Sequence, residues 1–213
     1  MFNELNSVEN FVRDILCGPV PIQGQVAEHG SEYIVGKAQK WKGLGWEYLP
    51  WISLPRQQND VLVEEHLRDA LIKLNPEIAE KPDRADEVLY KLRAIILAVH
   101  SDGLVKANEE FSSWLRGERS MPFGPNNQHT SVRLIDFENW HNNRFVVTQQ
   151  YTYKIGNVEK RFDLVLLING IPVVIGEAKT PTRPAATWFD GAYQVHEIYE
   201  EDVPAMFVPN IFS

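Results

Sequence analysis

Apolar residues recur at helical spacing through the first half of the chain. Between residues 61 and 74 they fall every three or four positions, which is the repeat of one buried helix face. Asn75-Pro76 is a stop signal that ends this segment. A second segment with the same repeat runs from residue 83 to Gly103. The pattern predicts helices over residues 4–17, 31–43, 59–74 and 83–103, and a shorter helix that holds Phe111, Trp114 and Leu115.

The pattern changes after Gly117 to short runs rich in β-branched and aromatic residues. Such runs, separated by Asn, Gly and Pro, are typical of strands. Asn169-Gly170 lies between the last two runs and is a strong signal for a hairpin turn. A helix is expected over residues 185–200, and AMFV (205–208) begins another strand. The other predicted strands cover residues 131–137, 144–155, 161–168 and 171–176.

Helices followed by a β-meander, a helix and a strand imply an α/β fold, with a sheet covered by helices. We expect residues 1–117 to form a mainly helical N-terminal region, part of the main domain or packed on it. Residues 118–213 would form the core that carries the sheet. The strand-like end AMFVPNIFS has no terminating signal, which indicates an N-terminal piece of a longer protein.

Composition and charge narrow the classes of function. No apolar run is long enough to span a membrane, and the start MFNELNSVEN is too polar for a secretory signal, so we expect a cytoplasmic protein. A single cysteine, and six histidines without the spacing of metal ligands, argue against a zinc site. The formal net charge of -8 argues against unaided binding to a phosphate backbone. A nucleic-acid substrate would therefore need a partner that delivers it.

Three charged residues flank the predicted hairpin. Asp163 lies on one arm, and Glu177 and Lys179 follow the apolar run of the other. The two carboxylates and the backbone carbonyl of Ala178 would give a hard oxygen site for Mg²⁺. Such an ion polarises a phosphate and acidifies a bound water, and Lys179 would position the nucleophile or stabilise the growing charge. These residues predict a metal-dependent nuclease site.

The register of the hairpin decides whether this site forms. Strand alternation places Glu177 and Lys179 on one face. In a regular two-residue hairpin, Asp163 points to the opposite face. The hypothesis therefore requires an odd-length turn or a β-bulge that shifts the register by one, and Pro172 is the candidate position. Without that shift, Glu177 and Lys179 are two solvated charges at the end of a strand.

Asp163, followed after thirteen residues by Glu177-Ala178-Lys179, resembles the signature of the PD-(D/E)xK nucleases. The surrounding sequence narrows the resemblance. RFDLVLLINGIPVVIGEAKTP, with LGWEYLP and ALIKLNPEI upstream, is similar to the N-terminal region of the restriction (motor) subunit, HsdR, of type I restriction-modification enzymes. The resemblance covers the chain from about residue 30 onward.

This resemblance implies a restriction-endonuclease-like mixed sheet flanked by helices, in which Asp163 and Glu177 bind Mg²⁺ and Lys179 is the catalytic lysine. It implies cleavage of duplex DNA in a complex with modification and specificity subunits, and weak or absent activity of this piece alone. The motor domains are expected beyond residue 213, so ATP belongs to the full-length subunit only. Two alternatives stay open: a non-catalytic docking module of the same fold, and an end-dependent repair-type exonuclease.

The resemblance also points to accessory residues. Such nucleases often carry Gln-x-x-x-Tyr on the helix after the lysine strand, but Gln194 and Tyr199 are five residues apart. On an α-helix that separation is about 140°, so both cannot point equally at the site. Either Tyr199 pairs with Val195 in this role, or Gln194 acts alone. Relatives also place an acidic residue on an early helix, for which Glu32 is the candidate, with a solvated surface position as the alternative. Candidates for phosphate contacts, or else residues of solvated loops, are Lys154, Lys160, Arg161 and Arg183.

Overall fold

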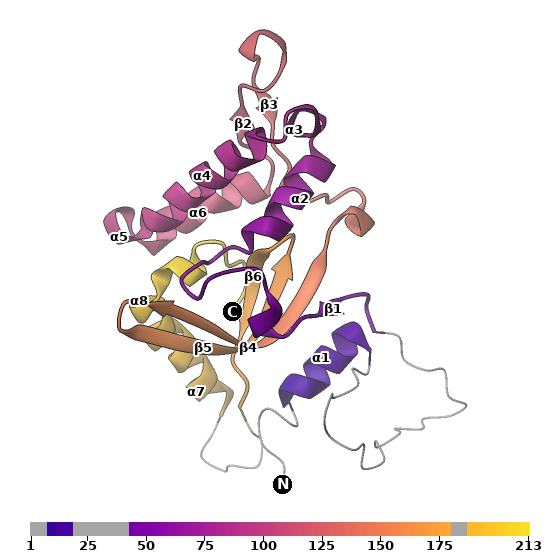
Figure 1. The fold of residues 1–213 in the computed structure, drawn as a ribbon. Coiled ribbons are helices and arrows are strands. Elements are labelled where there is room, and N and C mark those ends of the chain that lie inside the picture. The colour runs from indigo at the N-terminus through magenta and orange to yellow at the C-terminus, as the bar shows by residue number, and fades with distance from the viewer. Residues whose placement is uncertain (1–7, 19–42, 180–186) are drawn as a thin grey trace, which may run out of the picture.

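A four-stranded sheet lies at the centre of the molecule in this computed structural model, which describes residues 8–18, 43–179 and 187–213 (Figure 1). The strand order is β1-β4-β5-β6, with β1 parallel to β4 and the other neighbours antiparallel. The predicted α/β fold with a mixed sheet is therefore confirmed. The strands are β1 (Glu47–Tyr48), β4 (Phe145–Ile155), β5 (Val158–Ile168) and β6 (Ile171–Gly176).

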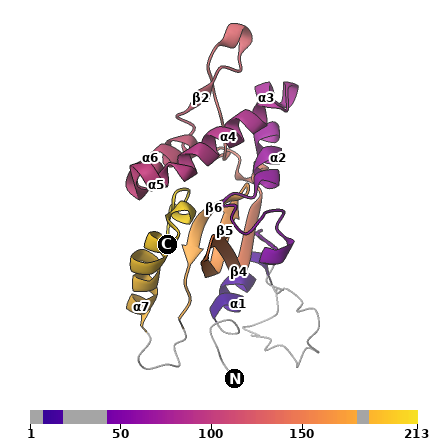
Figure 2. The same cartoon turned by 60° about the vertical axis from the view of Figure 1, so that its left-hand side comes forward.

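Helices flank this sheet (Figure 1, Figure 2). α4 packs against α2 and α6 beyond one end of the sheet, and α1 packs against β1 and β4. After β6, α7 continues into η5, a π-helix, and then into α8. The α-helices and the π-helix are α1 (Asn10–Cys17), α2 (Glu64–Leu74), α3 (Pro76–Glu80), α4 (Arg84–Leu97), α5 (Val99–Asp102), α6 (Leu104–Leu115), α7 (Trp188–Tyr193), η5 (Gln194–Tyr199) and α8 (Glu200–Asp202).

Short elements connect these helices and strands. A two-stranded ribbon, β2 and β3, projects away from the sheet beside α4 and α6 (Figure 1). Among the described residues, no helix has both the length and the apolar character needed to cross a membrane. The short elements are η2 (Trp51–Ser53), β2 (Ser120–Met121), η3 (Pro125–Asn127), β3 (Thr130–Ser131), η4 (Trp140–Asn142) and η6 (Pro204–Phe207).

The helices follow the predicted apolar periodicity over most of their length. The predicted helix over residues 59–74 begins later, at Glu64, because the Val63 N–H donates to the Gly170 carbonyl at 2.8 Å. That bond ties the preceding residues to the hairpin turn of the sheet. The helix predicted over residues 31–43 lies, except for Gly43, outside the described residues.

One apolar core joins the helices and the sheet. Leu67 of α2, Phe111 of α6 and Phe162 of β5 are fully buried in the same cluster, as is Met206. This cluster contains residues from both sides of residue 117, and β1 from the first half pairs with β4. The division into residues 1–117 and 118–213 stays a prediction.

The strand predicted over residues 131–137 is wrong for most of its length. Only Thr130 and Ser131 pair with β2. Side chains replace the strand partner: Asn75 Oδ1 accepts from the Arg133 N–H at 2.8 Å, and Asn75 Nδ2 donates to the Arg133 carbonyl at 2.9 Å. Because a side-chain amide can satisfy the same backbone groups as a neighbouring strand, alternation alone does not guarantee a strand.

The strand predicted at residues 205–208 is also wrong. Pro204–Phe207 forms a short 3-10 helix, η6, whose apolar residues fill the core. A short apolar run does not distinguish a buried helical turn from a buried strand. Strand-like pairing starts later, where Phe212 forms an isolated parallel bridge with Val174 of β6.

Candidate functional site

The hairpin between β5 and β6 turns at Asn169-Gly170, as predicted. Both residues have a left-handed backbone, with φ of 52° and 81°, which fits a two-residue turn of type I′. The Asn169 side chain binds the turn to two other segments of the chain. Its Oδ1 accepts from the Arg144 N–H and its Nδ2 donates to the Leu134 carbonyl, both at 2.8 Å. The turn therefore starts the hairpin in the regular register.

A β-bulge follows at once in β6. Leu167 pairs with Pro172, but Leu166 pairs with Val174, so Val173 is an extra residue on one strand. The predicted irregularity is confirmed, and it lies next to Pro172. Pro172 has no N–H to donate to the ladder, which makes the adjacent position a low-cost place to break the pairing.

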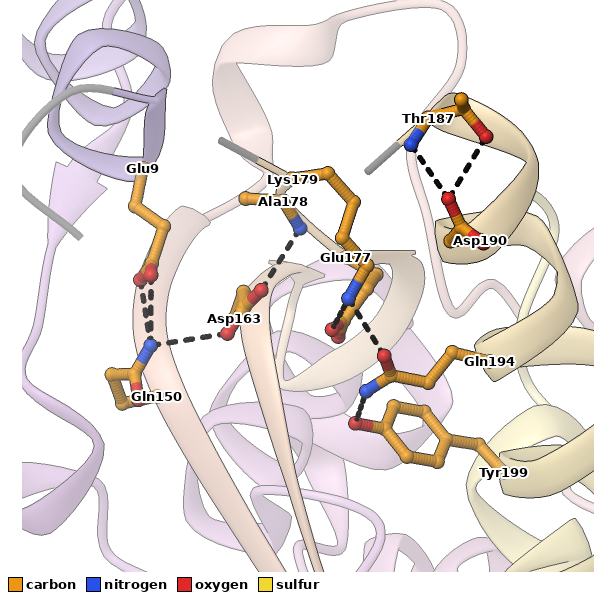
Figure 3. A network of polar contacts seen from close by, with 10 residues as sticks. All are labelled: Glu9, Gln150, Asp163, Glu177, Ala178, Lys179, Thr187, Asp190, Gln194 and Tyr199. Carbon is orange, nitrogen blue, oxygen red and sulfur yellow. Dashed lines mark hydrogen bonds and ion pairs between the residues drawn. The ribbon is translucent and has the colours of Figure 1, made fainter. Parts of the chain in front are cut away.

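The bulge brings Asp163 and Glu177 to opposite positions of the hairpin. Beyond it, Leu164 pairs with Gly176, and the same register sets Asp163 against Glu177. Asp163 Oδ2 accepts a hydrogen bond of 2.9 Å from the Ala178 N–H (Figure 3). The two predicted carboxylates are thus held at the same end of two neighbouring strands.

Lys179 connects this end of the hairpin to the helices that follow. Its Nζ donates to Glu177 Oε1 at 2.8 Å and to Gln194 Oε1 at 2.7 Å (Figure 3). Gly191 of α7 packs on the Lys179 stem, since an added Cβ would lie 3.5 Å from its Cγ. The Glu177 side chain is only 7% exposed, so this ion pair is shielded from water.

The prediction that Gln194 and Tyr199 lie on an α-helix and therefore cannot point equally at the site is wrong in its premise. Gln194–Tyr199 forms a π-helix, in which residues five apart lie nearly above one another, and Gln194 Nε2 donates to Tyr199 Oη. The extra residue of the motif is absorbed by this wider turn. Val195 is buried in the core, and its pairing with Tyr199 in this role stays a prediction. Burial raises the pKa of Tyr199 and the Glu177 charge adds to the rise, so its hydroxyl stays neutral.

Two residues of the site were not predicted from the sequence. Glu9, immediately before α1, is only 2% exposed, and both of its carboxylate oxygens accept from Gln150 Nε2 at 2.9 Å. The same nitrogen donates to Asp163 Oδ1 at 3.2 Å (Figure 3). Glu9 and Gln150 are 141 residues apart in the sequence. No local pattern signals this contact.

Burial raises the pKa of Glu9 from 4.5 to about 7, and the charges of Asp163 and Glu177 add to the rise, while the Gln150 hydrogen bond opposes it. Between these two pH values the unfolded chain loses the proton that the folded chain keeps. The stability contributed by protonated Glu9 is therefore complete below pH 4.5 and is lost as the pH rises through about 7.

Glu9→Gln should remove this pH dependence, because glutamine stays neutral at every pH. In EDTA, we expect the variant to match the wild type at pH 5 and to exceed its free energy of unfolding by about 2 kcal/mol at pH 8. Denaturant unfolding at both pH values measures this difference. Glu80→Gln, at an exposed position of α3, serves as the control and should change neither value. The prediction would be contradicted if the free energy of unfolding changed with pH by the same amount in the wild type and in Glu9→Gln.

The donor set at this end of the hairpin suits a hard cation. In the described part of the chain, no three His, Cys, Asp or Glu side chains are grouped so that they could hold a metal ion. Mg²⁺, however, commonly uses one or two carboxylates and keeps several waters. Asp163 and Glu177 supply that pair of oxygen donors. The role of the Ala178 carbonyl stays a prediction.

A pocket of about 590 Å³ adjoins the lysine. Glu177, Ala178 and Lys179 line one side of it, and Trp188 and Gly191 of α7 line another. Thr187 and Asp190 form a capping box that fixes the start of α7, with the Thr187 N–H donating to Asp190 at 2.6 Å (Figure 3). The space beside Glu177 and Lys179 is therefore bounded by a helix whose first turn is capped.

The candidate phosphate-binding residues have different environments. Lys154 pairs with Glu159 at 3.4 Å, and Lys160 pairs with Asp202 while lying over the Tyr199 ring. Arg161 is exposed on β5 near the site, where its charge lowers the pKa of Glu9 and Tyr199. Contact of these residues with DNA stays a prediction. Arg183 and Glu32 lie outside the described residues.

Comparison with known proteins gives consistent matches. Residues 35–213 match the family described as Type I restriction enzyme R protein N terminus. The chain is 33% identical over 185 residues to the type I restriction enzyme HindI endonuclease subunit of Haemophilus influenzae, covering 81% of this chain and 17% of that protein. It is 28% identical over 200 residues to the putative type I restriction enzyme MjaIXP endonuclease subunit of Methanocaldococcus jannaschii, covering 86% of this chain and 18% of that protein. No solved structure matches the chain significantly.

Proposed function

Since this chain belongs to the family of type I restriction enzyme R protein N termini, we propose that it is a Mg²⁺-dependent nuclease domain that cleaves duplex DNA. The observation that carries this proposal is the β-bulge at Val173, which brings Asp163 opposite Glu177. A regular hairpin would have separated these carboxylates by the thickness of the sheet. Relatives that are named endonuclease subunits support the same class of reaction.

Asp163, Glu177 and the Ala178 carbonyl would hold the Mg²⁺. When bound, the ion supplies Lewis-acid polarisation of the scissile phosphate and lowers the pKa of a bound water. The protein contributes the positions of the donors. The Ala178 N–H fixes the Asp163 carboxylate at 2.9 Å, and Lys179 fixes that of Glu177 at 2.8 Å.

Lys179 would act on the reacting phosphate itself. Its ammonium group is held between Glu177 and Gln194, at 2.8 and 2.7 Å, and so has a defined place, and Lys179 lines the pocket. From there it can orient the attacking water or stabilise the negative charge that grows on the phosphate. Tyr199 is a positioning residue, because it binds the Gln194 amide that in turn binds Lys179.

DNA delivery would depend on partners. The chain spans 17 to 18% of the length of the relatives named above, and its formal net charge is -8. A domain with this charge gains little from non-specific attraction to phosphates. We infer that the motor domains of a longer chain, and the modification and specificity subunits, bring DNA to the site in the cytoplasm.

Lys179→Ala tests the proposed reaction in the assembled enzyme. We expect the cleavage rate of circular duplex DNA with Mg²⁺ to fall by roughly 10²- to 10³-fold, which is typical for loss of one charge-stabilising donor. Metal binding should persist, because both carboxylates remain. Lys106→Ala, which removes an exposed lysine of α6 that pairs with Asp102, is the control and should retain most of the rate.

Other outcomes of this assay would favour one of the two alternative functions. Cleavage of linear but not circular DNA would favour the end-dependent exonuclease. Equal cleavage by wild type and Lys179→Ala would place the nuclease activity elsewhere in the assembly, and this chain would then be a docking module.

A further inference from the structure

Gln150 has an unusual backbone for its place in the fold. It lies in the middle of β4, yet its φ is 56°, in the left-handed region that non-glycine residues seldom adopt. The pairing on either side is regular: Gln149 faces Leu164 and Tyr151 faces Phe162. No extra residue explains the distortion. Strained backbone of this kind in a regular element is a reason to examine what the side chain does.

The Gln150 side chain occupies the space between two carboxylates. Its Nε2 donates to both oxygens of Glu9 at 2.9 Å and to Asp163 Oδ1 at 3.2 Å (Figure 3). Glu9 lies immediately before α1 and Gln150 lies in β4, while Asp163 lies on the facing position of β5. One neutral amide therefore joins three separate elements at the candidate metal site.

The neighbouring residue fixes the same helix by different contacts. Gln149 Nε2 donates to Asn10 Oδ1 at 3.0 Å, and its Oε1 accepts from Arg13 at 3.3 Å. Successive side chains of a regular strand point to opposite faces. Here both Gln149 and Gln150 contact the start of α1, and the left-handed backbone at Gln150 accounts for this.

We propose that Gln150 is a positioning residue that ties the Asp163 carboxylate to Glu9 and so orients Asp163 toward the proposed divalent cation, an inference that rests on the proposed function. A carboxylate has two oxygens and about four lone-pair positions, so an accepted hydrogen bond still leaves room for a cation. Hydrogen bonds to the carboxylates of a metal site orient them, and their removal commonly weakens metal binding by about 10- to 100-fold.

Gln150→Gly separates this role from a purely structural one. Glycine adopts a φ of 56° without strain, so the backbone is relieved while the bridging amide is lost. Gln150→Asn is the second variant, because asparagine tolerates the left-handed region and keeps the amide, but is one methylene too short to span both carboxylates. Gln149→Ala is the matched control, since it loosens α1 without touching Glu9 or Asp163.

Mn²⁺ titration of the 213-residue chain, followed by calorimetry and by the electron paramagnetic resonance signal of free Mn²⁺, measures the effect. We expect Gln150→Gly and Gln150→Asn to weaken Mn²⁺ binding by about 10- to 100-fold. Their melting temperatures in EDTA should stay within a few degrees of the wild type. Gln149→Ala should keep Mn²⁺ affinity within about threefold of the wild type.

Three results would overturn the proposal. Wild-type Mn²⁺ affinity in both Gln150 variants would show that the amide does not position the carboxylates, and would leave the proposed nuclease function intact. An equal loss in Gln149→Ala would assign the effect to docking of α1. A wild-type chain that binds no Mn²⁺ would overturn both this inference and the proposed metal dependence.

Discussion

Glu177→Ala and Asp163→Ala should each abolish Mg²⁺ binding by this chain. The two carboxylates face each other only because of the bulge at Val173, and each would supply half of the proposed pair of charged donors. Mg²⁺ gives up its waters reluctantly, so a single remaining carboxylate holds it weakly. Calorimetric titration with Mg²⁺ at low salt should show a binding signal for the wild type and none for either variant.

Cleavage by the assembled enzyme should fall with metal binding. Loss of metal-based charge stabilisation amounts to several kcal/mol, which corresponds to a rate lower by about 10³-fold or more. Glu159→Ala is the control, because Glu159 lies on the same strand as Asp163 but pairs with Lys154 at the surface. Unchanged Mg²⁺ binding in both site variants would mean that the ion binds elsewhere and would remove the main support for the proposed function.

Gly170→Ala should strongly destabilise the fold. Gly170 has a φ of 81°, and a Cβ at this position would lie 2.4 Å from the Val63 carbonyl oxygen and 3.0 Å from His66 Cβ. The obstructing groups belong to the start of α2, which is tied to the turn by the Val63 to Gly170 hydrogen bond. Relief would require the helix to move away from the sheet.

We expect Gly170→Ala to lower the free energy of unfolding by about 3 kcal/mol or more, from the left-handed backbone and the steric clash together. Gly156→Ala separates the cost of the left-handed backbone from the cost of the steric clash. Gly156 has a φ of 57° at the other hairpin turn, but nothing lies within 4 Å of its added Cβ, so about 1 kcal/mol is expected. Urea unfolding of both variants gives the comparison. Similar values for the two would show that α2 adjusts without cost.

Several features of the site were predictable because they are local. Asp163 lies on β5, and Glu177 and Lys179 directly follow β6, so the two-residue turn that joins these strands brings all three to the same end of the hairpin. The need for a register shift also follows from strand alternation, and Pro172 marked its place. The structure adds the detail that Val173 is the extra residue.

The error over Gln194 and Tyr199 has a different cause. Their spacing was measured against an ideal α-helix, in which residues five apart diverge. The chain instead adopts a π-helix over Gln194–Tyr199, and the gain is the pair of contacts that links Tyr199 to Gln194 and Gln194 to Lys179. The π-helix and these side-chain contacts occur together, which the spacing of the two residues on an ideal α-helix could not show.

The sequence by itself determined the class of fold, the hairpin and the three charged residues at its end, because periodicity, turn residues and strand alternation act over a few positions. Only the tertiary structure decided which distant residues complete the site. Glu9 contacts Gln150 across 141 residues of sequence, and Gln150 has its left-handed backbone in the strand on which α1 packs. The same holds for residues 204–207, whose apolar character reflects burial in the core and not a strand. Contacts of this kind depend on how elements pack, and packing is a property of the whole chain.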